Sequence, residues 1–356
     1  MKIGFVRRGY SPTGGAEAYL QRLAHGVAAE GHQPVLISSR DWPQAAWPND
    51  LVVHVDGVSP LRFAREVERA SSACDVVFSL ERIFSCDVYR AGDGVHRAWL
   101  ERRRRFESPW RRLTRWTNPK HRELLQLERC VFSTQRTRLV IANSRMVHDE
   151  IVTHYGYPAD RIKIIPNGYD APPLVSGLRE KRRAELGVAS DAFVVLFAGS
   201  GWERKGLQTA LDAVRDLPAA RLIVAGKGSV SKFRAPANAL FVGPRMNLQP
   251  DFAAADAFAL PTVYDPFSNA CLEALAAGLP VLTTSANGFS EVITDGIHGS
   301  IFAPGDVKAL RDAMRFWAAG SKATEARGEC LACASLYPAA QNTRLTLDAI
   351  MTLAPK

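Results

Sequence analysis

The stretch Tyr264-Asp-Pro-Phe-Ser-Asn-Ala-Cys-Leu-Glu-Ala-Leu-Ala-Ala-Gly-Leu-Pro-Val-Leu-Thr-Thr284 contains a loop, a helix and a strand in immediate succession. The loop Pro266–Ser268 is expected to open a helix that runs to Gly278, because glycine is typical just past a helix end. Pro280 then begins an apolar run that is typical of a buried strand. A helix that leads directly into a buried strand indicates an α/β fold.

Short apolar runs alternate with helical patterns on both sides of this stretch. The runs are continuous rather than alternating in polarity, which is typical of parallel strands covered on both faces. The segments between them are long enough for crossover helices. The expected strands are Ile3–Val6, Val35–Ser38, Asp75–Ser79, Leu139–Asn143, Lys163–Ile165, Val194–Ala198, Arg221–Ala225, Leu240–Val242, Ala257–Leu260, Pro280–Thr283 and Ser300–Phe302.

A stretch rich in proline and glycine interrupts the pattern between Asn167 and Gly177. We therefore predict two Rossmann-like, doubly wound α/β domains that face each other across a cleft, residues 1–169 and 170–335. A ligand is expected at the carboxyl ends of their strands.

The composition limits the class of protein. The chain has 356 residues, 47% hydrophobic and 23% charged, with a net charge of +9 that favours an anionic partner. We expect no membrane span, because no run approaches the roughly 18 apolar residues that one needs. The first apolar run is too short for a signal peptide, so we expect a cytoplasmic protein with reduced cysteines.

Two glycine-containing loops follow expected strands. Gly14 and Gly15 precede a helical pattern, where a tight turn and free helix N–H groups suit an anion, although an ordinary loop would look the same. In the second domain, Arg204 and Lys205 lie in a loop between Gly199 and Gly206. These cations could neutralise a diphosphate in place of a metal, or form an ordinary solvated pair.

The stretch that opens this section contains two acids, Asp265 and Glu273, separated by seven residues. The backbone amides of Phe267, Ser268 and Asn269 are expected to donate to phosphate oxygens at the start of the helix. Glu273 lies inside the helix among apolar neighbours, where a carboxylate needs a partner. A ribose diol would satisfy it.

This pattern resembles the E-x7-E signature of glycosyltransferase family 4, which comprises retaining enzymes with the GT-B fold. The resemblance covers roughly residues 1 to 310, and the motifs occur in the family's order. The further motifs are Ile141–Ser144, Ile165–Gly168, Arg204–Gly206, Ala276–Val281 and Gly288–Ile293. Within the family, Tyr89–Leu100 and the basic stretch after it are most similar to the bacterial lipopolysaccharide core glucosyltransferase I group.

The resemblance implies transfer of a hexose, glucose, from a UDP-sugar to a lipopolysaccharide core acceptor. The first domain would bind the acceptor and the second the nucleotide sugar. In similar folds the last helix crosses back to the first domain. Whether residues 336–356 do so here is left open by the sequence. The chain has no Asp-x-Asp motif, so neither a metal ion nor another cofactor is expected.

The resemblance also implies residue roles at the donor. Gly14 and Gly15 would hold the donor diphosphate from the first domain, and Arg204 and Lys205 would hold it from the second. Glu273 would bind the ribose.

Further roles concern the reacting sugar. Asp265 would bind its hydroxyl groups, although most relatives carry the longer Glu there. His96 would lie beside the anomeric carbon, and Asp93 would contact the acceptor.

A basic segment between Arg97 and Arg122 contains ten Lys or Arg and two Glu, a net +8 of the chain's +9. Cations beside indoles suit the headgroups of an anionic membrane or a phosphorylated acceptor; nucleic acid and a merely solvated helix are the alternatives. We favour the membrane headgroups or the phosphorylated acceptor. We therefore expect peripheral association with the inner membrane and no nucleic acid partner. The residues expected to face membrane or acceptor are Trp99, Arg102, Arg103, Arg104, Arg105, Trp110, Arg111, Arg112, Arg115 and Trp116.

Three other functions stay open. One is a family 4 transferase for another lipid- or polysaccharide-linked acceptor, and another is a sugar-nucleotide epimerase on the same fold. The non-enzyme alternative is a basic nucleic-acid-binding protein, which would leave Lys205, Asp265 and Glu273 without a purpose. The histidines other than His96, including His121, show no metal-ligand spacing and are expected on the surface or in packing.

Overall fold

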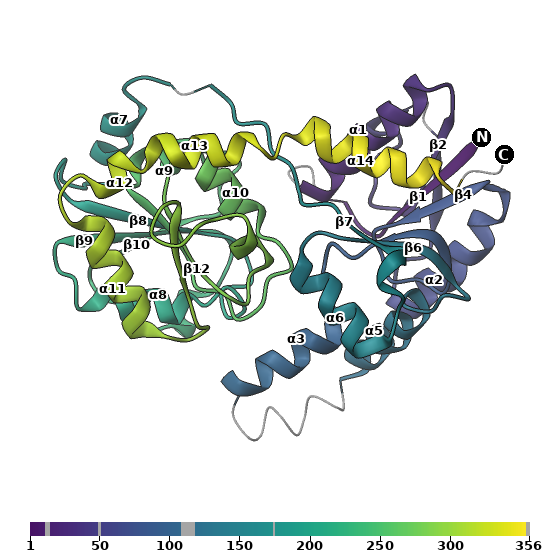
Figure 1. Ribbon diagram of the computed structural model, residues 1–356, viewed down its shortest axis with the longest axis horizontal. Coiled ribbons are helices and arrows are strands. Elements are labelled where there is room, and N and C mark those ends of the chain that lie inside the picture. The colour runs from purple at the N-terminus through teal and green to yellow at the C-terminus, as the bar shows by residue number, and fades with distance from the viewer. Residues whose placement is uncertain (11–14, 49–50, 108–117, 174, 354–356) are drawn as a thin grey trace. The chain divides into compact units, whose positions relative to one another are not determined.

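The computed structural model describes residues 1–10, 15–48, 51–107, 118–173 and 175–353 (Figure 1). The chain divides into two compact units. Unit 1 consists of Met1–Asn167 and Ala340–Lys356, and unit 2 consists of Gly168–Ala339. Each unit contains one parallel sheet, as the apolar runs predicted.

In the described part of unit 1, seven strands form a parallel sheet in the order β3-β2-β1-β4-β5-β6-β7. The helices connect successive strands or pack on the sheet. The bounds are β1 Lys2–Arg7, α1 Gly15–Ala29, β2 Gln33–Ser39, β3 Val52–Val55, α2 Pro60–Ala70, β4 Val76–Ser79, β5 Cys86–Arg90, α3 His96–Arg103, α5 Pro119–Val131, β6 Thr137–Ala142, α6 Arg145–Tyr155, β7 Ile162–Ile164 and α14 Ala339–Met351.

The described part of unit 2 contains a six-stranded parallel sheet in the order β10-β9-β8-β11-β12-β13. The bounds are α7 Leu178–Glu185, β8 Phe193–Ala198, α8 Leu207–Arg215, β9 Ala220–Ala225, β10 Ala239–Gly243, α9 Gln249–Ala254, β11 Ala257–Leu260, α10 Asn269–Ala276, β12 Val281–Thr284, β13 Gly299–Phe302, α11 Val307–Ala318, α12 Lys322–Glu325 and α13 Arg327–Ser335.

Each expected strand is confirmed, with ends that differ by at most two residues, and two strands were missed. β3 is a short edge strand whose two middle residues, Val53 and His54, are exposed, so it lacks a continuous apolar run. β5 carries Asp87 and Arg90. The Asp87 carboxylate accepts a hydrogen bond from the Val77 N–H at 2.9 Å, and the buried Arg90 donates to Asn167 at 2.6 Å. Both polar side chains, which hid β5 from a search for apolar runs, therefore find partners on other segments of the fold.

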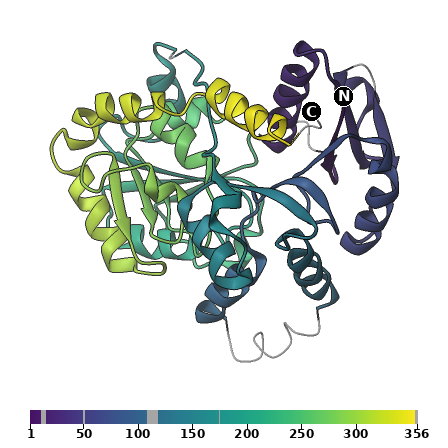
Figure 2. The same ribbon diagram turned by 45° about the vertical axis from the view of Figure 1, so that its right-hand side comes forward.

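The last helix, α14, lies beside α1 on one face of the sheet of unit 1 (Figures 1 and 2). The Tyr19 hydroxyl donates to Thr346 at 3.0 Å, and Leu347 packs where α1 has Gly26. The carboxyl ends of the parallel strands lie at one edge of each sheet, and the loops at those edges carry most of the predicted site residues.

Among the described residues, no helix combines the length and apolarity that a membrane span requires.

Candidate functional site

In unit 2, the loop that follows β8 places Lys205 against Asp265, where the two side chains form a buried ion pair. Gly206 ends this loop with a positive φ of 76°, and a Cβ there would lie 1.9 Å from the carbonyl oxygen of Pro261. Only glycine allows this approach, which brings the loop against the end of β11. The pairing of Lys205 with Asp265 joins two residues that the sequence analysis assigned to one ligand.

Backbone hydrogen bonds hold these loops together. The carbonyl oxygen of Arg204 accepts from the Thr262 hydroxyl and from the Val263 N–H, both at 2.9 Å. Asp265 in turn donates its N–H to Ala286 at 3.0 Å. The loops after β8, β11 and β12 are thus linked through main-chain groups. The side chain of Arg204 makes no ion pair or hydrogen bond within the described part of the chain, so its charge is available.

Asn287 organises the start of α10. Its Oδ1 accepts from the backbone N–H groups of Ser268, at 3.3 Å, and Phe289, at 3.1 Å, while its Nδ2 donates to Thr283 at 3.0 Å. The Ser268 N–H, expected to donate to a phosphate, is therefore already engaged in this structure. Sequence reasoning missed Asn287, although it directly precedes the Gly288–Ile293 motif.

Glu273 lies on α10 and is half-buried, and its carboxylate has no ion pair or hydrogen bond with any described residue. Burial raises the pKa of this carboxyl above its usual range. Its charge also raises the pKa of Tyr169, after the larger effect of burial, and the Tyr169 hydroxyl accepts a hydrogen bond from Gln249 at 3.3 Å. A half-buried carboxylate without a partner is suited to bind hydroxyl groups of a ligand. Tyr169 and Gln249 were not predicted from the sequence.

In unit 1, His96 is the first residue of α3 and is buried. Its Nε2 lies 3.1 Å from Nδ1 of His121, and the two rings pack against each other. Burial, followed by the positive charge of Arg82, lowers the pKa of His96 to about 3. The imidazole is therefore neutral at physiological pH.

Glu128 holds the start of α3. This fully buried carboxylate accepts hydrogen bonds from the backbone N–H groups of His96, at 2.5 Å, and Arg97, at 3.0 Å. It also accepts from Arg82 at 3.0 Å and from the Tyr155 hydroxyl at 2.6 Å. A carboxylate at a helix N-terminus is favoured by the helix dipole, so Glu128 fixes the orientation of His96. It carries no sequence signal, because its partners come from distant segments.

Asp93 lies exposed in the turn between β5 and α3. Burial lowers the pKa of the Arg7 guanidinium, but the negative charges of Glu81, Glu17 and Asp93 together outweigh burial and raise it. The Arg7 guanidinium donates to Glu81 at 3.0 Å. Asp93 is therefore close to a charged cluster at the carboxyl ends of β1 and β4. Gly14 lies outside the described residues, and Gly15 is the first residue of α1.

The described part of the basic segment is partly neutralised. Arg102 pairs with Glu150 at 2.7 Å and Arg103 with Glu107 at 2.5 Å. The Arg103 guanidinium also lies 5.5 Å from the centre of the half-buried Trp99 ring. Arg104 and Arg105 are exposed. The other predicted residues of this segment, Trp110, Arg111, Arg112, Arg115 and Trp116, lie outside the described residues.

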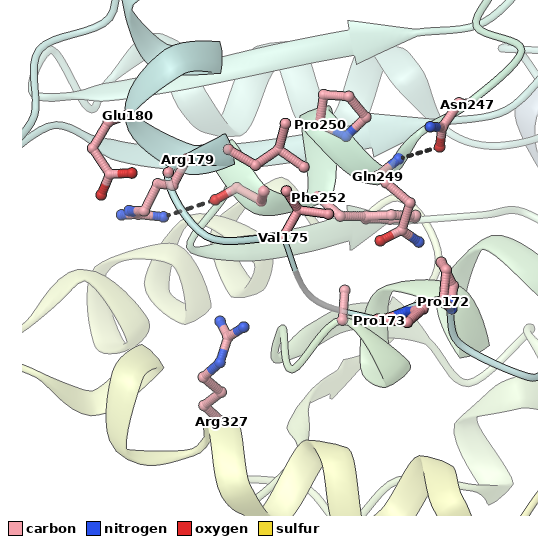
Figure 3. A pocket seen from close by; sticks show the side chains of 14 residues that line it. Pro172, Pro173, Val175, Arg179, Glu180, Asn247, Gln249, Pro250, Phe252 and Arg327 are labelled. Atoms are coloured by element: carbon pink, nitrogen blue, oxygen red, sulfur yellow. Dashed lines mark hydrogen bonds between the residues drawn. The ribbon is translucent and has the colours of Figure 1, made fainter.

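Unit 2 also contains a pocket of about 740 Å³ that is mostly apolar (Figure 3). Phe252, Pro250 and Val175 line it, and Arg327 lies at one side. Neither the Lys205–Asp265 pair nor Glu273 is among its described lining residues, so we do not place the reaction there. Within the described ranges, no group of three or more His, Cys, Asp or Glu side chains is arranged to hold a metal ion.

Two families match the chain: Glycosyltransferase Family 4 over residues 13–171, and Glycosyl transferases group 1 over residues 192–319. The lipopolysaccharide glucosyltransferase WaaG of Escherichia coli K12 is 26% identical over 341 residues, covering 88% of this chain and 89% of that protein.

Two solved structures show the same fold. The crystal structure of WaaG, described as a glycosyltransferase involved in lipopolysaccharide biosynthesis, matches with a TM-score of 0.81 at 23% identity, covering 98% of this chain and 99% of the other. Anabaena Alr3699/HepE in complex with UDP-glucose matches with a TM-score of 0.77 at 20% identity, covering 99% and 100%. The predicted resemblance and fold are both confirmed: this chain is a glycosyltransferase with the GT-B fold, composed of a family 4 domain followed by a group 1 domain.

Proposed function

We propose that this protein transfers glucose from UDP-glucose to a lipopolysaccharide core acceptor, with retention of the anomeric configuration and without a metal ion. The observation that carries the proposal is the set of charges in unit 2. The largely buried Lys205–Asp265 pair lies in the loops after β8 and β11, and Arg204 and Glu273, in the first of these loops and on α10, have no side-chain partner among the described residues. This set matches the needs of a sugar nucleotide, whose diphosphate is anionic and whose ribose presents a diol.

In the proposed complex, the diphosphate replaces Asp265 as the partner of Lys205 and also binds Arg204. The freed Asp265 carboxylate accepts hydrogen bonds from hydroxyl groups of the transferred sugar, while Glu273 accepts from the ribose. The amides of Phe267 and Asn269, at the start of α10, and the loop with Gly14 and Gly15 contribute further donors. The similarity to WaaG and to a UDP-glucose complex supports UDP-glucose as the donor.

Two cationic side chains and backbone amides then stabilise the charge that develops on the leaving diphosphate, the task a divalent metal performs elsewhere. The leaving diphosphate takes the proton of the acceptor hydroxyl on the same face of the sugar, so no protein nucleophile is required. Unit 1 binds the acceptor. His96, held neutral, lies beside the anomeric carbon, and Asp93 contacts the acceptor. Catalysis consists of positioning and electrostatic stabilisation.

We further propose that the enzyme works in the cytoplasm, associated with the inner membrane through the basic segment. The net +8 between residues 97 and 122 and the exposed Arg104 and Arg105 support attraction to anionic headgroups. Sedimentation with vesicles of anionic or zwitterionic lipid tests this proposal. Equal binding to both kinds of vesicle would contradict it.

The donor proposal is tested by binding measurements in the presence of EDTA with UDP, GDP, ADP and UDP-hexoses. A ligand at about one hundred times its dissociation constant stabilises the fold by about 2.7 kcal/mol, which a thermal shift detects. We expect a response to UDP and UDP-glucose that Lys205→Met abolishes. The control Lys181→Met removes an exposed lysine from α7 and should leave the response unchanged. A response to GDP compounds alone would refute UDP-glucose as the donor. A strict need for Mg²⁺ would refute the metal-free mechanism.

The transfer itself is followed with labelled UDP-glucose and lipopolysaccharide truncated at the inner core. The anomeric coupling constant of the product reports retention or inversion. An inverted product would contradict only the proposed retention. Transfer only to other acceptors would contradict only the proposed lipopolysaccharide acceptor.

A further inference from the structure

A second pocket, of about 690 Å³, lies at the carboxyl edge of the sheet in unit 1. It is formed where β1, β2 and β3 end: Ser39 and Val55 are the last residues of β2 and β3, and Arg8 directly follows β1. These three strands are neighbours in the sheet. The carboxyl edge is where open α/β sheets bind ligands, so the pocket lies where a substrate of this unit is expected.

Two close backbone approaches shape this pocket. A Cβ on Gly57 would lie 2.8 Å from the Cβ of Ser39, so a larger residue at position 57 would push the loops apart. Gly9 has a φ of 76° and donates its N–H to the Ser39 hydroxyl at 2.9 Å. The pocket is therefore a built feature of the loops rather than a gap between loose side chains.

The pocket's cations are available, whereas its acids are engaged. Asp56 pairs with Arg62 at 2.8 Å, and Asp41 accepts from the Ser39 hydroxyl at 3.5 Å. The guanidinium groups of Arg8 and Arg40 make no ion pair or hydrogen bond within the described ranges. Uncommitted guanidinium groups favour a phosphate or carboxylate, which they can bind through paired N–H groups.

Other lining groups favour a sugar as the carrier of that anion. The carboxylates of Asp41 and Asp56 keep acceptor capacity for hydroxyl groups. Val58 lines the pocket with an 81% exposed side chain, which offers an apolar surface to the C–H face of a sugar ring. A site with cations, hydroxyl acceptors and one apolar wall suits an anionic sugar better than a free inorganic ion.

We infer that this pocket is an acceptor subsite that binds a sugar carrying a phosphate or a carboxylate. The inference rests on the proposed transferase function and deepens it, because it names the chemical class of the acceptor. Arg8 and Arg40 bind the anionic group, and the two aspartates bind hydroxyl groups of the same sugar. Neutral sugars are disfavoured, because they offer the Arg8 and Arg40 guanidinium groups no charged hydrogen-bond acceptor.

Binding to the full-length protein tests the inference with mannose 6-phosphate, glucuronate, neutral mannose and inorganic phosphate as probes, followed by NMR. We expect saturable binding of at least one anionic sugar, and comparison of the first two probes distinguishes phosphate from carboxylate. Arg8→Gln and Arg40→Gln should each weaken this binding at least tenfold. Arg65→Gln removes an exposed arginine from α2 and serves as the matched control with unchanged binding.

Three results would overturn the inference: no saturable binding of either anionic sugar, an equal loss in Arg65→Gln, or inorganic phosphate binding as tightly as the sugar phosphate. UDP is titrated into every variant, and its affinity should not change. If UDP fails to bind the wild type while anionic-sugar binding depends on Arg8, the proposed function fails and the pocket assignment stands. Unchanged melting temperatures establish that the variants are folded.

Discussion

One charged residue in unit 2 is held in a state that a ligand would relieve. Glu273 is half-buried without a partner among the described residues, and burial raises its pKa. In the folded protein without ligand, the ionised carboxylate is therefore less favourable than in the unfolded chain. Such strain is expected at a binding site, where the ligand later compensates it.

Glu273→Gln should separate stability from function. Because the pKa of Glu273 is raised, ionisation of this carboxyl lowers the stability of the wild type as pH rises above about 4.5, the ordinary value. The variant lacks this contribution, because glutamine does not ionise. We therefore expect the ligand-free variant to be at least as stable as the wild type at pH 7, with a difference that disappears near pH 4. UDP affinity should fall about 10- to 100-fold, because a charge-assisted hydrogen bond is lost.

Urea unfolding across this pH range, together with UDP titration, measures both effects. Glu329→Gln, at an exposed position of α13, is the matched control and should change neither quantity. A variant that is less stable at pH 7 but binds UDP normally would show that Glu273 has a structural role instead.

His96 gives the protein a specific dependence on pH. Its pKa is about 3 in the folded state, and the ordinary value is 6.5, so the unfolded chain binds more protons between these values. The contribution of neutral His96 is therefore fully present above pH 6.5 and is lost as pH falls toward 3. Between pH 7 and pH 5 this loss amounts to about 2 kcal/mol.

His96→Gln keeps a polar group beside His121 but cannot titrate, so its stability should fall less between pH 7 and pH 5 than that of the wild type. The exposed His25 is the control, and His25→Gln should retain the wild-type dependence. Identical pH profiles for the wild type and His96→Gln would contradict the assignment of a neutral imidazole.

At the scale of elements, the loop between β8 and α8 depends on one crowded glycine. Gly201 and Gly206 have almost the same φ, 73° and 76°, but only Gly206 has backbone atoms where a Cβ would be. Gly201→Ala should cost about 1 kcal/mol for the left-handed conformation alone. Gly206→Ala should cost about 1–3 kcal/mol more, because the loop must move away from Pro261.

The same displacement moves Lys205, so Gly206→Ala should also weaken UDP binding, whereas Gly201→Ala should not. Urea unfolding and UDP titration of the two variants measure the contrast. Equal effects on stability and binding would show that the contact with Pro261 does not position the loop.

At the scale of the whole molecule, the chain's end belongs to unit 1. Leu347 of α14 is buried against α1, and we expect Leu347→Ala to cost about 2–4 kcal/mol through the cavity it leaves. Leu345 on the same helix is 37% exposed, so Leu345→Ala is the control and should cost less than about 0.5 kcal/mol. In calorimetry, Leu347→Ala should lower the transition of unit 1 only.

UDP identifies the other transition, because under the proposed function it raises the melting temperature of unit 2 more than that of unit 1. If Leu347→Ala shifts both transitions equally, the two units unfold as one cooperative body. The position of α14 would then affect the donor half as well.

The sequence by itself predicted most of the strands and the glycosyltransferase family. Continuous apolar runs predicted the parallel strands, since strands covered on both faces need apolar residues on both. The spacing of Asp265 and Glu273 and the basic pair Arg204–Lys205 predicted a nucleotide-sugar site, and the family comparisons confirm a glycosyltransferase. These signals are local, because each lies within one loop or helix.

Only the tertiary structure decided which distant residues meet. It paired Lys205 with Asp265 and placed His121 beside His96. It also brought the Glu128 carboxylate within hydrogen-bond distance of the first N–H group of α3. It also joined the ends of β1, β2 and β3 into a pocket that Arg8 and Arg40 line. No local pattern encodes such contacts, because a side chain's partners and burial depend on the order of strands in the sheet. The same reason explains why β5 was missed: its polar groups find their partners on other strands and loops.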